Sequence, residues 1–441
     1  MRRIAVIGTG YVGLVSGTGL ADFGNEVTCL DIDHKKIKTL KKGALPIWEP
    51  GLIEMVRKNV RAGRLHFSVD VEAGIRDAEL VIIAVGTPSA EDGQADLSQV
   101  FTVAETIGKN LDGHQFVVTK STVPVGTGAE IRRIIGKVAQ KGSSFEVISN
   151  PEFLREGSAV YDFMHPDRVV IGSETEQGQG IMQEIYRPLY LIETPFIFTN
   201  IATAELIKYA SNAFLATKIT FINEIANLCD QVGADVHVVA KTMGLDGRIS
   251  PKFLHPGPGF GGSCFPKDVR ALQAIGEKMG YRAKLIQAVT EVNEAQKLRM
   301  FEKLQSLLPD LEGKTVTLLG LAFKQRTDDV RESPSLPIIN RLKAVKANIK
   351  AFDPVAIDSM KKIHPDLEYV DDLYDSVTDA HAVMVLTEWN EFRGIDLARV
   401  KQLMQEPILV DCRNLYDPDT ARQIGFKYAC VGRETYSEKL S

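Results

Sequence analysis

A chain of 441 residues is longer than one ordinary hydrophobic core supports, so two or three domains are expected. Its composition of 44% hydrophobic and 25% charged residues is that of a water-soluble globular protein, and its net charge of -5 argues against general binding to nucleic acid or membrane surfaces. The chain has no apolar run long enough to predict a membrane span. Its five cysteines form no CxxC pair, which predicts no zinc or other metal site, no disulfide framework and a cytoplasmic location.

Short apolar runs alternate with helical segments over the first part of the chain. Six of these runs predict strands, at residues 3–7, 27–33, 80–85, 116–121, 145–149 and 168–172. Strands separated by helices are typical of a parallel sheet with helices on both faces. We therefore expect residues 1–200 to form an N-terminal Rossmann-like domain.

The sequence pattern changes at residue 201. Residues 201–233 contain no proline, place their only glycine last and repeat apolar residues at helical spacing, which predicts one long helix. More helical sequence covers 267–308, so we expect a central helical domain over 201–308. Four apolar runs then predict a second, smaller Rossmann-like domain over 309–441: TVTLLGLAF, NIKAFDP, AVMVLTEW and PILVDC. The expected fold class is α/β, with two doubly wound parallel-sheet domains joined by a long central helix.

A glycine motif, GTGYVG at 8–13, lies between the first predicted strand and a predicted helix. Asp31 ends the next strand, 18 residues after the last glycine. The glycines permit a tight turn and close approach of a pyrophosphate to the helix N-terminus, and Asp31 would accept hydrogen bonds from ribose hydroxyls. A carboxylate there repels a 2′-phosphate, so the pattern favours NAD over NADP. Lys35 and Lys36 soften that preference, because either would attract a phosphate.

Two further loops follow predicted strands, GTP at 86–88 and STVPVGTG at 121–128. Ligands of open parallel sheets bind at the carboxyl ends of the strands, so Thr87 and Thr122 are candidates to line the nicotinamide side. The same residues also suit ordinary turns. The sequence leaves both interpretations open.

Charged residues crowd the NPEFLREG segment at 150–157, which also follows a strand. Glu152 or Glu156 would orient a water or act as a base, and Arg155 would meet a phosphate. A helix beginning at Asn150, with Pro151 in its first turn, is the competing hypothesis.

Three polar residues of the long helix, Glu205, Lys208 and Asn212, are spaced three and four apart and share one face. A solvated face is the usual explanation for such a set. The helix is otherwise mostly apolar, however, and a buried lysine needs a partner or a function. We therefore expect a functional role for this face.

Cys264 lies in the stretch FGGSCFPKD at 260–268. Many cysteines are small buried hydrophobes, which is one explanation for this residue. The alternative is a nucleophile, because Lys267 or a helix N-terminus favours the thiolate and the glycines admit a substrate to the sulfur. Hydride transfer from an alcohol needs no covalent intermediate, whereas carrying an aldehyde on to an acid benefits from one.

These motifs together resemble the nucleotide-sugar 6-dehydrogenases of the UDP-glucose/GDP-mannose dehydrogenase family, and within it the bacterial UDP-glucose branch. The resemblance spans nearly the whole chain and also rests on PIWEPGL at 46–52, ELIKYASNAF at 205–214 and GLAFKQRTDDVRESPS at 320–335. One departure is Gln325-Arg326, where many relatives have Pro-Asn, which puts the conformation of that loop in doubt.

The resemblance implies two successive NAD-dependent oxidations at C6 of UDP-glucose, giving UDP-glucuronate and two NADH, in a homodimer formed through the central helices. Three alternatives remain open. The first is another nucleotide sugar, GDP-mannose or an N-acetylated UDP-hexosamine. The second is a two-electron hydroxyacid dehydrogenase, and the third is a non-catalytic protein that senses NAD.

The resemblance also assigns residues to the site. Catalytic residues would be Cys264, Lys208, Asn212, Asp268, Thr122 and Glu152. Within that set the cysteine is the nucleophile, the lysine stabilises the oxyanion with help from the asparagine, the aspartate and threonine hold water, and the glutamate is the base of the last step.

Ligand contacts follow from the same motifs. Cofactor contacts would come from Gly8, Gly10, Tyr11, Val12, Gly13, Asp31, Lys36, Thr87, Thr122, Glu156, Lys267 and Arg331. Substrate contacts would come from Glu152, Phe153, Leu154, Arg155, Glu156, Lys208, Asn212, Arg248, Phe253, Leu254, His255, Pro256, Gly257, Gly261, Phe323 and Lys324. Of these, Arg248 resembles a family arginine that reaches into the neighbouring subunit's site.

Overall fold

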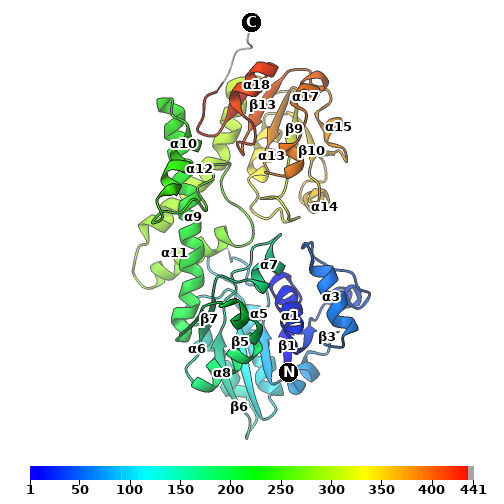
Figure 1. The fold of residues 1–441 in the computed structure, drawn as a ribbon, viewed down its shortest axis with the longest axis vertical. Helices are drawn as coiled ribbons and strands as arrows, with labels where there is room; N and C mark the ends of the chain where they lie inside the picture. The colour runs from blue at the N-terminus through cyan, green and yellow to red at the C-terminus, as the bar shows by residue number, and fades with distance from the viewer. Residues whose placement is uncertain (91, 436–441) are drawn as a thin grey trace. The chain divides into compact units, whose positions relative to one another are not determined.

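The computed structural model describes residues 1–90 and 92–435, and Figure 1 follows them by colour along the chain. The chain divides into two compact units. The first unit is Met1–Ser211 with Ala274–Tyr281, and the second unit is Asn212–Gln273 with Arg282–Ser441. The division falls inside the 32-residue helix α9, so this single helix contributes residues to both units.

An eight-stranded sheet forms the centre of the first unit, in the order β3-β2-β1-β4-β5-β6-β7-β8. Its strands are β1 (Arg3–Ile7), β2 (Glu26–Leu30), β3 (Leu65–Ser68), β4 (Leu80–Ile83), β5 (His114–Thr119), β6 (Ser144–Ser149), β7 (Val169–Gly172) and β8 (Phe196–Thr199). All six predicted strands are present. The strands missed, β3 and β8, are the two edges, where partial burial weakens the apolar signal. The sheet departs from a purely parallel one only between β6 and β7, which pair antiparallel at Ser149 and Gly172.

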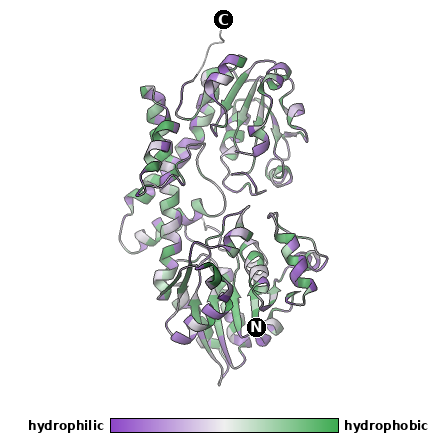
Figure 2. Cartoon of the chain, viewed as in Figure 1, coloured by the Kyte–Doolittle hydropathy of each residue, from purple (hydrophilic) through white to green (hydrophobic). Residues whose placement is uncertain are grey.

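Helices cover both faces of this sheet. They are α1 (Tyr11–Asp22), α2 (His34–Lys41), α3 (Leu52–Arg61), α4 (Val71–Asp77), α5 (Ser98–Asn110), α6 (Thr127–Val138), α7 (Ala159–Met164), α8 (Glu176–Ile185) and the 3-10 helix η1 (Arg187–Ile192). Side chains alternate along β1, so Ile4 and Val6 enter one hydrophobic cluster while Ala5 and Ile7 enter another. Figure 2 shows the resulting pattern of hydrophobic strands beside helices with one polar face.

The long helix predicted over 201–233 is confirmed as α9 (Ile201–Val232). Gly233, with φ of +73°, follows its last residue as a helix stop. Further helices are α10 (Val236–Leu245), α11 (Phe265–Lys278) and α12 (Lys284–Leu307). Buried residues of α9 and α12, such as Ile222 and Met300, share one hydrophobic cluster with the second unit's sheet.

That sheet is parallel throughout, in the order β11-β10-β9-β12-β13-β14. Its strands are β9 (Thr315–Leu319), β10 (Asn348–Phe352), β11 (Glu368–Tyr369), β12 (Ala382–Val385), β13 (Ile408–Asp411) and β14 (Lys427–Cys430). Its helices are α13 (Ser335–Ala344), α14 (Ile357–Lys361), α15 (Leu373–Val377), α16 (Asn390–Arg393), α17 (Leu397–Leu403) and α18 (Pro418–Ile424). The four predicted strands are present, and the expected fold class is confirmed. Across residues 1–90 and 92–435, no helix has the length and hydropathy that crossing a bilayer requires.

Candidate active site

In the turn between β1 and α1, close packing requires glycine at two of the three glycine positions. The third position has open space around it. Gly8 has a φ of +103°, and a Cβ there would lie 2.6 Å from the carbonyl oxygen of Ala84. A Cβ at Gly13 would lie 1.9 Å from the carbonyl oxygen of Gly8, so neither position accepts a side chain. A Cβ at Gly10, the N-cap of α1, would meet nothing within 4 Å. A dinucleotide phosphate therefore has room to approach the first turn of α1.

Asp31 lies one residue beyond β2 and faces this turn. Its carboxylate accepts hydrogen bonds from the backbone N–H of Thr9 at 2.9 Å and the Thr9 hydroxyl at 2.7 Å, and Lys36 Nζ lies 3.7 Å away. Burial alone would raise the pKa of Asp31, but these donors and the N–H of Asp33 together hold it below its ordinary value. An ionised acceptor at the end of β2 fits the ribose of NAD.

The two loops predicted to line the nicotinamide side contact each other. Thr87 Oγ1 donates to the carbonyl oxygen of Thr122 at 2.9 Å, and the hydroxyl of Ser121 donates to that of Val85 at 2.7 Å. Strands β4 and β5 are neighbours, so their carboxyl ends bring these loops together. The roles of the two threonines toward NAD remain predictions.

A buried ion pair joins Glu152 to Lys208. Their side chains are 5% and 4% exposed, and Lys208 Nζ lies 2.9 Å from Glu152 Oε1. The other carboxylate oxygen accepts the N–H of Leu154 at 2.5 Å. Burial alone would raise the pKa of Glu152, but the Lys208 ammonium and this N–H keep it below its ordinary value. The partner that a buried lysine needs is therefore Glu152.

Arg155 and Asn150, near Glu152 in the sequence, bind other protein groups, and the predicted contact of Arg155 with a ligand stays a prediction. Arg155 is held by Asp162, through contacts of 2.6 and 2.9 Å, and its pKa is raised by them. The hypothesis of a helix beginning at Asn150 is wrong, because the next helix, α7, begins at Ala159. Asn150 is instead buried, and its side-chain oxygen accepts hydrogen bonds from Lys120 at 3.0 Å and Tyr186 at 2.8 Å.

The ring of Phe153 lies close to two cations, Arg168 and Lys208, and nothing in the sequence indicated that these residues meet. The guanidinium of Arg168 lies 3.6 Å from the ring centroid and Lys208 Nζ lies 5.4 Å from it. Both distances suit cation–π contacts. Arg168 follows α7 in the chain, and the sequence analysis assigned it no role in the site.

Glu205 holds α9 to the start of α6. Its two carboxylate oxygens accept the N–H groups of Gly126 at 2.8 Å and Gly128 at 2.7 Å. A Cβ at Gly128 would lie 3.2 Å from Glu205 Oε1 and 2.5 Å from Ile201 Cγ2, which explains the glycine. Burial raises the pKa of Glu205 to about 7, although the two N–H groups oppose the shift. The residue therefore links the 121–128 loop to the turn of α9 that carries Lys208.

In the second unit, Asp268 is the centre of a buried polar group. It is 1% exposed, and its carboxylate accepts Asn212 Nδ2 at 2.6 Å and Lys267 Nζ at 2.6 Å. Its own N–H donates to the carbonyl oxygen of Cys264 at 2.8 Å, across the first turn of α11. Cys264 thus directly precedes the N-terminus of α11, where partial positive charge favours an anion.

Cys264 differs from the other cysteines in exposure. The remaining four are buried, whereas Cys264 is partly exposed. Burial raises the pKa of Cys29 and of Cys430 to about 12 and also raises that of Cys412 and Cys229. Only a thiol that solvent reaches is available for reaction, so the geometry favours Cys264 as the nucleophile.

Buried amides of α9 and α12 hold the loop that leads to Cys264. Asn293 accepts the N–H of Phe260 at 2.8 Å and donates to its carbonyl oxygen at 3.1 Å. Asn223 accepts the N–H of Gly257 at 2.8 Å, and Gln296 donates to its carbonyl oxygen at 2.9 Å. Sequence reasoning missed these three amides, because an amide in a helix is equally typical of a solvated face.

The glycines of this loop pack closely on the 320–335 segment. A Cβ at Gly261 would lie 2.3 Å from the carbonyl oxygen of Glu332, and one at Gly262 would lie 2.7 Å from the Phe323 ring. Arg413, which the sequence did not mark, donates to the carbonyl oxygen of Phe323 at 2.8 Å and lies 3.5 Å from a Cβ built at Gly257. Predicted substrate residues of the two segments therefore adjoin within the second unit.

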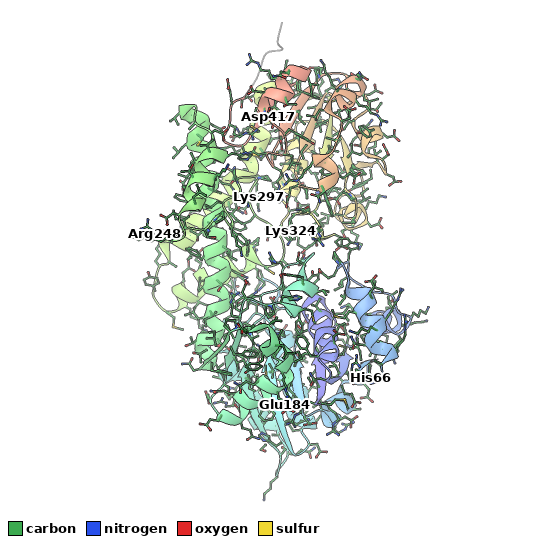
Figure 3. All side chains as sticks on the ribbon, viewed as in Figure 1. His66, Glu184, Arg248, Lys297, Lys324 and Asp417 are labelled. Carbon is green, nitrogen blue, oxygen red and sulfur yellow. The ribbon has the colours of Figure 1, made fainter. Side chains whose placement is uncertain are left out.

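Arg248, Arg331 and Lys324 were predicted to bind ligands, and their contacts in the structure do not decide these roles. Arg248 pairs with Asp246 at 2.6 Å, and its side chain is 90% exposed. Figure 3 shows Arg248 projecting away from the body of the second unit. Arg331 pairs with Asp329 at 2.7 Å, and Lys324 Nζ lies 5.5 Å from the Phe323 ring centroid. The exposure of Arg248 suits a residue that reaches another subunit, and all three roles remain predictions.

Over the described ranges 1–90 and 92–435, no three His, Cys, Asp or Glu side chains gather closely enough to hold an ion.

Comparison with known proteins matches three domain models of one family. Residues 2–190 match the NAD binding domain of the UDP-glucose/GDP-mannose dehydrogenase family, 202–295 its central domain and 317–418 its UDP binding domain. The chain is 49% identical to the UDP-glucose 6-dehydrogenase TuaD of Bacillus subtilis, over 98% of this chain and 94% of that protein. It is 49% identical to a UDP-glucose 6-dehydrogenase of Rhizobium meliloti, over 98% and 99%.

A solved structure agrees with these matches. The UDP-glucose dehydrogenase of the archaeon Pyrobaculum islandicum superposes with a TM-score of 0.92 at 37% identity, covering 98% of both chains. The resemblance drawn from the motifs, the class of enzyme and NAD as cofactor are thereby confirmed.

Glu205 predicts a pH-dependent stability. The pKa in the folded state, about 7, exceeds the ordinary 4.5, so the folded protein binds this proton more tightly and loses stability as pH rises from 4.5 to 7. The loss amounts to roughly 3 kcal/mol at full extent. The variant Glu205→Gln has no titrating group at this position, so this pH dependence of stability disappears. The melting temperature of the variant minus that of wild type should therefore increase by several degrees between pH 5 and pH 8.

Calorimetric melts across that pH range check the expectation. Glu176→Gln, an exposed carboxyl on α8, serves as the control and should follow the wild type throughout. A Glu205→Gln offset that is constant with pH would contradict it.

Proposed function

Since this chain belongs to the UDP-glucose/GDP-mannose dehydrogenase family, we propose that it oxidises C6 of UDP-glucose to the carboxylate of UDP-glucuronate. One turnover consumes two NAD⁺ and one water and yields two NADH. The observation that supports the full oxidation is Cys264, a partly exposed thiol at the N-terminus of α11. An alcohol-to-aldehyde oxidation alone has no need of that group.

The chemistry proceeds through a bond to sulfur. NAD⁺, when bound at the glycine turn, accepts the hydride in each oxidation. After the first oxidation the thiolate of Cys264 adds to the C6 aldehyde: its electron pair forms the C–S bond, the C=O π pair moves to oxygen, and protonation of that oxygen gives a thiohemiacetal. Oxidation of that adduct leaves a thioester. Water then attacks the thioester carbon, the C–S bond breaks, and the carboxylate and thiol are released.

Charged residues of the first unit suit the developing charges. Lys208 is buried and paired with Glu152, so an ammonium is available to stabilise an oxyanion without bulk water. The pKa of Glu152 lies below its ordinary value, so this residue is an ionised acceptor and fits the base of the hydrolysis step. Thr122 would hold the water.

Residues of the second unit complete the assignment. Asn212 donates to Asp268 in a group that is almost fully buried. The aspartate therefore has a fixed orientation, which suits the holding of a water, while the amide assists Lys208 at the oxyanion. Both roles are part of the proposal.

The nature of the sugar nucleotide follows from the relatives. Proteins 49% identical to this chain are named as UDP-glucose 6-dehydrogenases, which favours UDP-glucose over GDP-mannose and N-acetylated UDP-hexosamines. We also assign the enzyme to the cytoplasm, because a reactive thiol persists in a reducing compartment.

Stoichiometry separates these possibilities. With UDP-glucose we expect two NADH for each sugar consumed, and a kcat/KM at least a hundredfold above that with GDP-mannose. Absorbance at the NADH band together with chromatographic assay of the sugar nucleotide gives both numbers. One NADH per sugar would instead support a two-electron dehydrogenase, and NAD binding without turnover would support a sensor.

Cys264→Ser should abolish UDP-glucuronate formation, lowering it at least a thousandfold, because a serine hydroxyl is a far weaker nucleophile at neutral pH. Binding of NADH should stay within twofold of wild type. Product analysis and a fluorescence titration measure the two effects. Cys29→Ser, at a buried cysteine, is the control, and full acid production by Cys264→Ser would overturn the covalent route.

An exposed apolar stripe on α9 supports the homodimer. Phe214, Phe221, Leu228 and Val232 are 65%, 44%, 56% and 74% exposed, and their spacing of seven, seven and four places them on one helix face. Exposed large apolar side chains in such a row are typical of a protein interface. We assign this stripe to contact with a second copy of the chain.

Phe221→Lys should weaken the dimer at least a hundredfold, because it places a charge in the middle of the stripe. Sedimentation equilibrium over a range of concentrations measures the dissociation constant. Leu285→Lys, which alters a 64% exposed leucine on α12, is the matched control and should remain dimeric. A wild type that sediments as a monomer, or a Phe221→Lys variant that dimerises normally, would contradict the assignment.

A further inference from the structure

The PIWEPGL motif at 46–52 carries a buried carboxylate that the proposed chemistry does not use. Glu49 is 6% exposed. Its Oε1 accepts the N–H of Ala159 at 2.8 Å, and its Oε2 accepts the N–H of Gly157 at 2.7 Å. The phenol of Tyr11 also donates to Oε2. One carboxylate therefore satisfies three donors.

These donors come from two segments with different assigned ligands. Tyr11 is the first residue of α1 and belongs to the glycine motif assigned to NAD. Gly157 directly follows the 152–156 segment assigned to the sugar nucleotide, and its N–H also lies 2.8 Å from the Tyr11 oxygen. Gly157 has a φ of +77°, so the chain turns sharply at this contact.

We propose that Glu49 is a positioning residue. It fixes the 152–156 segment against the glycine motif at 8–13, so that the cofactor and the sugar nucleotide bind in the correct positions relative to each other. The inference rests on the proposed function, because it takes its two ligands from there. All of the contacts lie within the first unit. None of the roles proposed for the reacting groups falls on Glu49.

Only a carboxylate of this length meets the three donors. A glutamine presents one acceptor oxygen and one NH₂ group, so the N–H of either Gly157 or Ala159 would face another donor. An aspartate is one methylene shorter and would lose contact with at least one segment. Buried donors without an acceptor are strongly unfavourable, so the segment would move rather than tolerate the mismatch.

Glu49→Gln tests the proposal, with KM as the deciding quantity. We expect the KM for NAD⁺ and the KM for UDP-glucose each to rise at least fivefold, with kcat reduced at least tenfold. A purely structural role would lower the fraction of active protein and so reduce kcat while leaving both KM values unchanged. Glu54→Gln, an exposed carboxyl five residues along on α3, is the control and should keep all three constants within twofold.

Tyr11→Phe is the second variant and carries the test if Glu49→Gln does not fold. It removes the phenol and leaves both N–H contacts of Glu49 in place. We expect the KM for UDP-glucose to rise at least twofold, although Tyr11 is assigned to the NAD side. An unchanged KM for UDP-glucose in both folded variants, or in Tyr11→Phe alone where Glu49→Gln is unfolded, overturns the inference.

The two proposals fail in different ways. A wild type and Glu54→Gln that do not oxidise UDP-glucose overturn the proposed function. In that case the dissociation constant of NADH, measured by fluorescence, still tests the contact, and a value in Glu49→Gln equal to that of wild type overturns it. Unchanged constants beside an active wild type overturn the role of Glu49 alone.

Discussion

The buried ion pair between Glu152 and Lys208 is the interaction on which the first unit's chemistry depends. Removing two charges from water costs several kcal/mol for each ion, and a pair survives burial only where geometry and extra hydrogen bonds compensate. Here a 2.9 Å contact and the Leu154 N–H supply that compensation. The Lys208 ammonium helps to hold the pKa of Glu152 below its ordinary value, so a cation and an ionised acceptor lie side by side. The proposed chemistry assigns these two groups to an oxyanion and an attacking water.

Helix α9 carries Lys208 and two further polar residues, and each of the three is held by a different part of the chain. Glu205, Lys208 and Asn212 lie on one face over two turns, and each has a different partner: the 121–128 loop, Glu152 and Asp268. Glu205 and Lys208 belong to the first unit, and Asn212 belongs to the second. The 201–233 segment therefore carries polar residues of the candidate site as well as apolar residues of the core.

Sequence patterns predicted the parts of this protein that local rules determine. The central strands and the turn at Gly8 follow from apolar runs and backbone sterics, and α9 from its uninterrupted spacing. The edge strands β3, β8 and β11 were missed because exposed or partly exposed residues weaken their apolar pattern, whereas β14 was missed although three of its four residues are buried. The pairing of Arg155 with Asp162 and the clamp by Asn293 were missed for a different reason. A charged or amide side chain reveals its partner only after the fold brings distant segments together.

Two lysines near the loop that carries Cys264 are paired with carboxylates. Lys267 was expected to supply positive charge, yet it pairs with Asp268 at 2.6 Å. Lys297, whose Cγ lies 3.4 Å from a Cβ built at Gly259, pairs with Glu294 at 2.7 Å. Amides rather than ions hold the loop itself. The N-terminus of α11, which directly follows Cys264, is a local source of stabilisation for a thiolate.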